Sequence, residues 1–328
     1  MSISLGALTI DDPVILAPMS GVTDLPFRRL VKRAGAGLVV SEMIASEAMI
    51  RATQRTLKMS SNCAEEFPMA VQLAGCDPQV MAEAARLNLD RGAAIIDINF
   101  GCPVKKVVNK QAGSALMRDE ALAGRILAAV VRAVPLPVTL KMRLGWDEQS
   151  RNAPRLARIA EESGIRMLTV HGRTRAQLYR GAADWDAVGE VRAATSLPLI
   201  VNGDIADGPG AREAMRRSGA DGVMIGRAAY GRPWLLAQIA RYLKGQPAEA
   251  EPPPGQRGEL VLEHYEAMLS YYGVEKGLRM ARKHLSWYAT GLRGANGFRQ
   301  KVNQVSDPEQ VRRAITDLFE LEAEALAA

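Results

Sequence analysis

The chain has 328 residues, of which 48% are hydrophobic and 24% are charged. This composition is ordinary for a globular protein and excludes a disordered chain, a collagen-like fibre and a coiled coil. Lys and Arg (42) exceed Asp and Glu (36) by six, and this modest positive charge attracts phosphate backbones irrespective of their sequence. The length fits about two domains, or a barrel with a small additional domain.

The three cysteines, Cys63, Cys76 and Cys102, are too few, and odd in number, for the disulfide framework of a secreted protein. The first residues contain neither a basic segment nor a long apolar run, so we expect no signal peptide. No stretch approaches the roughly 18 apolar residues that a membrane span needs. We therefore expect a cytoplasmic protein that does not enter a membrane.

Eight short apolar runs alternate with helical patterns through the first two thirds of the chain. The runs are nearly continuous in Val, Ile, Leu and Met, which is typical of parallel strands buried on both faces. Eight strands with intervening helices favour a (β/α)8 TIM barrel over a doubly wound sheet, which usually has fewer strands. The predicted strands cover residues 14–18, 37–41, 69–73, 94–99, 137–141, 167–171, 198–202 and 222–226.

A proline-rich segment, residues 245–255, interrupts this pattern. It contains three consecutive prolines, which favour an extended spacer. Beyond it, apolar residues recur with helical spacing and no strand-like run follows. We therefore predict a catalytic barrel domain over residues 1–244, a linker over 245–255 and a small all-helical domain over 256–328.

Polar residues collect just after the apolar runs, and barrels carry their active sites at these C-terminal strand ends. Strand ends also become polar simply because the chain reaches solvent there, but this explains poorly why Gln, Asn, Lys and His end otherwise apolar strands. After strands 7 and 8, barrels commonly bind phosphate, because glycine lets backbone N–H groups approach an anion. The glycines there can also be mere turn formers. The residues concerned are Asn202, Gly203, Asp204, Gly226 and Arg227.

Cys102 lies between Gly101 and Pro103 in the loop after the fourth predicted strand. A lone cysteine is usually a small buried hydrophobe. On the functional face it can instead act as a nucleophile, for which His171 is the only barrel histidine available as a base, or as a proton donor. These alternatives stay open.

Lys141 ends the fifth predicted strand, inside the barrel mouth. Burying an ammonium group without a partner is costly, so we expect Lys141 to face negative charge, such as the pyrimidine end of a flavin ring. The Rossmann fingerprint and the Walker lysine loop are absent, whereas a flavin mononucleotide (FMN) suits the barrel. Because no Cys/His cluster has metal-ligand spacing, we predict no metal.

A series of segments along essentially the whole chain resembles the flavin-dependent tRNA-dihydrouridine synthases, specifically their bacterial B-type branch. Ser20 stands where many relatives have Ala, a change from which we expect little effect. The segments are residues 17–24 (APMSGVTD), 72–75 (QLAG), 99–103 (NFGCP), 105–107 (KKV), 113–117 (GSALM), 141–143 (KMR), 169–174 (TVHGRT), 202–205 (NGDI) and 225–228 (IGRA).

The resemblance implies reduction of uridines in the D-loop of tRNA to 5,6-dihydrouridine, with NADPH reducing a tightly bound FMN whose N5 passes hydride to uracil C6. It assigns Cys102 as the acid that protonates C5, and Asn99 and Arg173 as contacts to uracil, with His171 shared. No obligate protein partner is indicated. The implied FMN site consists of Pro18, Met19, Ser20, Gln72, Lys141, His171, Asn202, Gly203, Asp204, Gly226 and Arg227.

Residues 276–301 contain seven Lys and Arg residues and no acidic residue, with His284, Trp287 and Tyr288 interleaved. A run of charge is usually only a solvated helix face, and Trp287 can belong to a core, so the residues alone leave RNA binding open. The resemblance identifies this region with the family's tRNA-binding helical domain. The predicted tRNA contacts are Lys276, Arg279, Arg282, Lys283, Arg293, Arg299 and Lys301.

Two alternative functions fit part of the pattern. A dihydroorotate dehydrogenase-like barrel also uses a flavin and a loop thiol, there as a base, but a small anionic substrate needs no basic helical domain. An RNA-binding protein that has lost catalysis would have no use for Cys102, Lys141 and the phosphate segments. The residues therefore favour the synthase.

Overall fold

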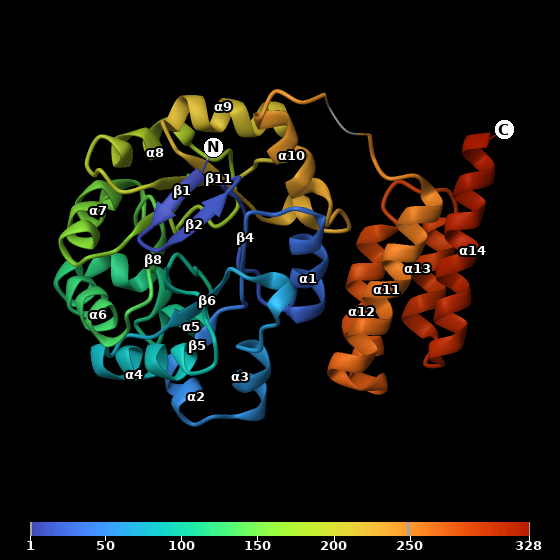
Figure 1. The fold of residues 1–328 in the computed structure, drawn as a ribbon, viewed down its shortest axis with the longest axis horizontal. Coiled ribbons are helices and arrows are strands. Elements are labelled where there is room, and N and C mark those ends of the chain that lie inside the picture. Colours follow the sequence, from blue (N-terminus) through green and yellow to red (C-terminus); the bar gives the residue numbers. More distant parts are fainter. Residues whose placement is uncertain (1, 248–249, 328) are drawn as a thin grey trace. The chain divides into compact units, whose positions relative to one another are not determined.

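The computed structural model describes residues 2–247 and 250–327. Its barrel strands and their one short neighbour are β3 (Val14–Leu16), β4 (Leu38–Val40), β5 (Ile44–Ala45), β6 (Met69–Ala74), β7 (Ile95–Phe100), β8 (Val138–Arg143), β9 (Met167–His171), β10 (Leu199–Asn202) and β11 (Gly222–Ile225). All pairings among these strands are parallel, and β3 pairs with both β4 and β11, while β4 pairs with β6 (Figure 1). The sheet therefore closes into an eight-stranded barrel, and the predicted TIM barrel is confirmed.

Helices follow the strands and surround the barrel (Figure 1). They are α1 (Leu25–Ala34), α2 (Ser46–Ile50), α3 (Gln54–Met59), α4 (Pro78–Leu89), α5 (Lys105–Val108), α6 (Glu120–Ala133), α7 (Ala153–Glu162), α8 (Trp185–Arg192), α9 (Gly208–Ser218) and α10 (Leu235–Leu243), with 3₁₀ helices at Ala64–Glu66, Gly113–Arg118, Glu148–Ser150 and Arg227–Ala229. The start of α4 shows why these helices begin where they do. The Asp77 carboxylate accepts from the amides of Gln79 and Val80, and Pro78 occupies the first turn.

An antiparallel hairpin, β1 (Ser2–Leu5) and β2 (Leu8–Asp11), precedes the barrel. Its buried side chains Ile3, Leu5 and Ile10 belong to one apolar cluster with side chains from the barrel strands. The sequence contains little sign of this hairpin, because each short strand presents only one or two inward apolar residues.

Alternation along the strands separates the apolar core from the polar mouth. Ile95 belongs to the apolar cluster, and Asp97 and Asn99 follow it on the same face of β7. Ile200 and Asn202 repeat this arrangement on β10. The barrel interior is therefore apolar toward the N-terminal strand ends and polar toward the C-terminal ends.

The C-terminal region forms a separate helical unit of α11 (Pro254–Tyr272), α12 (Val274–Tyr288), α13 (Ala295–Gln304) and α14 (Pro308–Ala327). Residues 229–234 also belong to this unit. Its core includes the fully buried Tyr265 and Ile315. The first helix, α11, begins inside the predicted linker, and residues 248–249 of that linker lie outside the described residues. Within the described part of the chain, no helix combines the length and the apolar character needed to cross a membrane.

Candidate active site at the barrel mouth

The strand register brings the predicted residues together at the C-terminal ends of the barrel strands. Asn99 on β7 is in register with Lys141 on β8, and His171 on β9 is in register with Asn202 on β10. Asn99, His171 and Asn202 are each more than nine-tenths buried. Four consecutive strands therefore contribute polar side chains to one mouth.

The loop that carries Cys102 is tied down on two sides. Asn99 Oδ1 accepts hydrogen bonds from the backbone amides of Gly101 and Cys102, at 3.0 and 2.8 Å. The amide and hydroxyl of Ser114 donate to the Cys102 carbonyl at 3.1 and 2.9 Å. Gly113 has a φ of +63°, and a Cβ there would lie 2.8 Å from the same carbonyl oxygen. Only glycine permits this approach, so the thiol is carried on a fixed backbone.

Burial raises the pKa of the Cys102 thiol, although nearby Arg143 and Lys141 favour the thiolate. The ordinary pKa of a thiol is already about 8.5, so Cys102 carries its proton at neutral pH. The thiolate is the reactive nucleophile of a cysteine, whereas the thiol can donate a proton. Of the two roles left open by the sequence, the environment favours the proton donor.

Lys141 is fixed by Asn202, whose Oδ1 accepts from the Lys141 ammonium at 3.2 Å. Asn202 is itself held because its Nδ2 donates to the Met224 carbonyl at 2.8 Å. Burial, reinforced by Arg143, lowers the pKa of Lys141 to about 8. Lys141 is therefore mainly charged at neutral pH and is placed to stabilise negative charge in the mouth.

Arg173 is buried, and each of its guanidinium nitrogens is engaged. Both terminal nitrogens donate to the Asp204 carboxylate, one of them at 2.9 Å, and Nη1 lies 3.4 Å from His171 Nε2. Nη2 and Nε donate to the carbonyls of Gly181 and Arg180 at 2.6 and 3.2 Å. Arg173 therefore braces the loop after β9. Its predicted contact with uracil stays a prediction, and it would require one of these hydrogen bonds to be exchanged.

The mouth is strongly cationic around His171. Burial lowers the pKa of His171 well below its ordinary value, so the imidazole is neutral at pH 7. Four positive side chains reinforce this shift: Lys141, Arg143, Arg173 and Arg227. Asp204 opposes them: although partial burial raises its pKa, the hydrogen bonds from Arg173 and from the Ala183 amide outweigh that effect, and the pKa is lowered. The carboxylate is therefore ionised at neutral pH.

Glycines shape the segments after β10 and β11. Gly203 has a φ of +118°, and a Cβ there would lie 2.8 Å from His171 Cδ2, so a side chain is excluded. A Cβ on Gly226 would instead clash with nothing, because its nearest neighbours, Ala17 Cβ and Met19 Sδ, would lie at an ordinary van der Waals distance of 3.9 Å. Beside it, the half-exposed Arg227 lies 3.5 Å from an Asp204 oxygen. A guanidinium next to an uncrowded glycine fits a phosphate group.

The loop after β3 holds three more of the predicted cofactor residues, and Gln72 lies on β6. Pro18 and Met19 are partly buried and Ser20 is exposed. The Met19 amide donates to Thr23 Oγ1 at 3.0 Å, and the Gly21 amide donates to the buried Glu42 carboxylate. These two contacts fix the loop before α1 begins.

The predicted RNA contacts lie in the helical unit, on α12, on α13 and in the loop between them. Arg279 forms an ion pair with Glu275 at 3.1 Å, and both side chains are largely exposed. The Lys276 ammonium lies 5.1 Å from the centre of the Tyr272 ring. Lys301 lies 3.7 Å from Asp317. Two of the predicted contacts, Arg279 and Lys301, therefore have a carboxylate partner within the helical unit.

Some of the residues between 276 and 301 serve the structure of the helical unit. Arg299 Nε donates to the Ser286 carbonyl at 3.2 Å and so joins α13 to α12. His284 is buried, and the Trp287 ring is stacked on Tyr230 at 4.1 Å. Trp287 therefore contributes to packing, as the alternative interpretation of the sequence allows, and His284 does so as well.

A family model described as dihydrouridine synthase matches residues 15–324. This chain belongs to the dihydrouridine synthase family. A "Probable tRNA-dihydrouridine synthase" of Rickettsia bellii is 55% identical over 97% of this chain and 98% of the relative. A "tRNA-dihydrouridine synthase B" of Xanthomonas campestris is 50% identical over 96% of this chain and 95% of the relative. The resemblance to the B-type branch is confirmed.

Among solved structures, morphinone reductase in complex with tetrahydroNAD aligns with 78% of this chain and 93% of its own, with a TM-score of 0.54 and 16% identity. This likeness shows the barrel fold alone. The dihydrouridine synthase match, by contrast, extends through α13 and into α14. It therefore argues against the alternative of a dihydroorotate dehydrogenase-like barrel without a helical domain.

Two residues of the mouth were not singled out from the sequence as site residues. Arg143 is buried, and its Nε donates to the Gly101 carbonyl at 2.9 Å, beside Cys102. Asp97 is buried in the strand that ends at Asn99. The signal for both is strand alternation, because each lies two residues from a predicted site residue on the same strand face.

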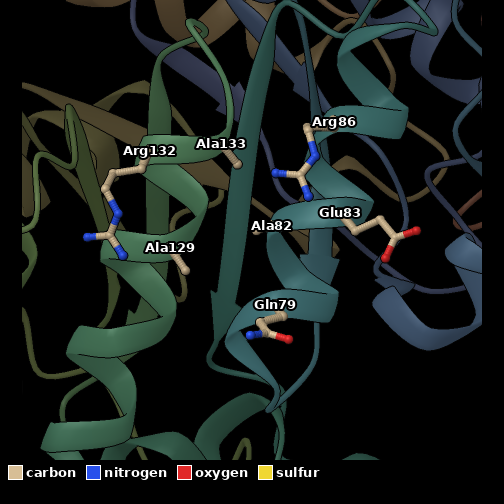
Figure 2. A pocket seen from close by; sticks show the side chains of 7 residues that line it. All are labelled: Gln79, Ala82, Glu83, Arg86, Ala129, Arg132 and Ala133. Atoms are coloured by element: carbon tan, nitrogen blue, oxygen red, sulfur yellow. The ribbon is translucent and has the colours of Figure 1, made fainter.

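A pocket on the outside of the barrel, between α4 and α6, does not bring charged side chains together as the mouth does, among the residues that line it. Figure 2 shows that the Glu83 carboxylate and the Arg132 guanidinium point to opposite sides. Its lining comes from helix surfaces rather than from strand ends. The barrel mouth is therefore the better candidate for the active site of this dihydrouridine synthase.

Proposed function

We propose that this chain reduces uridines in the D-loop of tRNA to 5,6-dihydrouridine, with FMN bound in the barrel mouth and NADPH as the electron source. The observation that carries the proposal is the position of Cys102 at the barrel mouth, on a backbone that Asn99 holds in place, and burial raises the pKa of its thiol. Curated relatives at 50 to 55% identity over nearly the whole chain are named tRNA-dihydrouridine synthases, which supports the substrate class.

The residues present fit FMN in two respects. The uncrowded backbone at Gly226, with Arg227 beside it, suits the phosphate. The cationic Lys141, held by Asn202, suits the pyrimidine end of the ring, where negative charge accumulates. We propose that the remaining members of the implied set complete the site: Pro18, Met19, Ser20, Gln72, His171, Gly203 and Asp204. When bound, FMN would supply the hydride that adds to C6 of uracil.

Cys102 acts as the acid in this proposal. Hydride addition at C6 leaves an electron pair and negative charge at C5 and the adjoining carbonyl, and the Cys102 proton is transferred to C5. The resulting thiolate is stabilised by Arg143 and Lys141, the cations that already favour it. Solvent protons then restore the thiol. Asn99 holds the thiol-bearing backbone during this transfer.

The RNA substrate has to expose its uracil before this chemistry can occur. A uridine in a tRNA loop can leave its stack at modest cost, and the cationic mouth attracts the neighbouring phosphates. In the proposal, the basic residues of α12 and α13 bind the RNA backbone. Arg279, Arg282 and Lys283 on α12 supply this attraction without reading the base sequence.

The test is an assay of the purified full-length protein with FMN, NADPH and tRNA from cells that lack dihydrouridine. We expect a yellow protein and an increase of two mass units at one or a few uridines, measured by mass spectrometry of nuclease fragments. A protein that binds tRNA but leaves every uridine unchanged would instead support the alternative of an RNA-binding protein that has lost catalysis. NADH in place of NADPH tests the choice of electron source.

A further inference from the structure

Asp97 is a buried carboxylate in the interior of the barrel, with 4% of its surface exposed. Its neighbours in register are Gln72 on β6 and Thr139 on β8. Thr139 Oγ1 donates to Asp97 Oδ1 at 2.6 Å, and Gln72 Nε2 donates to Asp97 Oδ2 at 2.7 Å. Both carboxylate oxygens therefore act as acceptors in these hydrogen bonds. Burial raises the pKa of Asp97, and the hydrogen bonds from Thr139 and Gln72, together with the charge of Lys141, oppose that shift.

A continuous chain of hydrogen bonds leads from Asp97 to the Cys102 loop. Gln72 Oε1 accepts from Asn99 Nδ2 at 2.7 Å, and Asn99 Oδ1 accepts from the Cys102 amide at 2.8 Å. Each amide side chain can present its oxygen or its nitrogen in either direction. In this chain Asp97 Oδ2 accepts from the nitrogen of Gln72, which leaves Gln72 Oε1 to accept from Asn99 Nδ2 and Asn99 Oδ1 to accept from the loop amides.

We propose that Asp97 is a positioning residue that fixes the Cys102 loop through Gln72 and Asn99. The proposal deepens the proposed function, because it rests on Cys102 as the proton donor. An alternative role for Asp97 is only to balance the charge of Lys141. If Asp97 only balances charge, replacing its carboxylate leaves the Cys102 loop in place. If Asp97 positions the loop, the same replacement loosens it.

The test uses the rate at which iodoacetamide alkylates each cysteine of the full-length protein, resolved by peptide mass spectrometry over a range of pH. Cys63 and Cys76 serve as internal references. We expect Asp97→Asn, which keeps the volume but adds a donor, to raise the pH-independent limiting rate at Cys102 about fivefold, the effect of one lost hydrogen bond. Asn99→Ala should have a similar effect, and the double variant should exceed neither single variant by much, because both break one chain.

Glu66→Gln is the matched control, since Glu66 is a fully buried carboxylate that pairs with Arg28 at 2.8 Å away from this chain of bonds. We expect it to lower stability without changing the Cys102 rate. An unchanged Cys102 rate in folded Asp97→Asn, or effects of Asp97→Asn and Asn99→Ala that multiply, would overturn the proposal. If Asp97→Asn does not fold, Gln72→Leu breaks the same chain of hydrogen bonds between Asp97 and Asn99. We expect the same increase in the Cys102 rate from it, and an unchanged rate would overturn the proposal.

This readout needs neither tRNA nor NADPH. A protein that failed to form dihydrouridine, and so contradicted the proposed function, could still show the coupling of Asp97 to Cys102. Conversely, an active enzyme in which Asp97→Asn leaves the alkylation rate unchanged would contradict the positioning role alone.

Discussion

The barrel mouth and the basic surface of the helical unit both gather charge, but they do so in different ways. In the mouth, Lys141 and Arg173 are largely withdrawn from solvent and fixed by hydrogen bonds to other side chains or to carbonyls. On α12, Arg279 is 62% exposed and pairs with a carboxylate that is itself exposed. The mouth therefore holds its charges in fixed positions, as the proposed chemistry requires, whereas α12 offers exposed charge, as the proposed binding of a flexible polyanion requires.

The largest effect should come from Cys102→Ala, which removes the proposed acid and leaves the rest of the mouth in place. We expect dihydrouridine formation to fall by about 10²- to 10⁴-fold, the usual contribution of a positioned acid. Flavin content and flavin reduction by NADPH should be retained, as measured by absorbance at constant protein concentration. Cys76→Ala is the control, and it should keep full activity. Equal activity in Cys102→Ala would remove Cys102 from the mechanism.

A second effect, smaller than the first, should follow from Lys141→Met. Loss of a hydrogen bond from a charged group is expected to weaken FMN binding about 10- to 100-fold, measured by flavin fluorescence. Lys110→Met, at an exposed lysine of the same unit, is the control. Because the pKa of Lys141 is lowered to about 8, its charge is lost as pH rises through that value, so FMN affinity of the unaltered protein should fall above pH 8. Affinity that is constant from pH 7 to 9.5 would contradict this role.

On the helical surface, reversing two charges should weaken RNA binding without altering chemistry in the mouth. We expect Arg279→Glu together with Lys283→Glu to reduce tRNA affinity about tenfold at moderate salt. The slope of log K against log salt concentration should become shallower by about one for each phosphate that the protein no longer neutralises. Arg313→Glu, on the exposed side of α14, should change affinity less. Unchanged affinity and salt dependence in the double variant would exclude this surface from the RNA site.

The last effect concerns the core of the helical unit, and it appears only when the pH falls below neutral. Burial lowers the pKa of His264 to about 3, and it also lowers the pKa of His284, whose ring lies 4.8 Å from that of His264. In the unfolded chain these histidines take up protons below about pH 6.5. The unfolded state then binds more protons, so His264 should lower the free energy of unfolding by about 2 kcal/mol between pH 7 and pH 5, and His284 should lower it further. Urea titrations monitored by circular dichroism would measure this, and stability that does not fall would contradict the shifted pKa values.

Sequence patterns predicted the barrel because its strands are buried on both faces and so read as continuous apolar runs. The same patterns missed the N-terminal hairpin, whose strands are short, and Asp97, which lies inside an otherwise apolar strand. Because Lys141 and Asn202 each end a predicted strand, the sequence also predicted that both lie at the barrel mouth. It could not show that Arg173 is engaged with Asp204, or that Trp287 stacks on Tyr230, because those contacts depend on loops and helix packing distant in sequence.

The most direct measurement is a map of dihydrouridine in total tRNA from cells in which the gene for this chain has been deleted. We expect one or more positions of the D-loop to lose the modification, to regain it when the unaltered gene is returned, and to remain unmodified with a Cys102→Ala allele. A map identical to that of the parent cells, or one restored equally well by the Cys102→Ala allele, would contradict the proposed reaction.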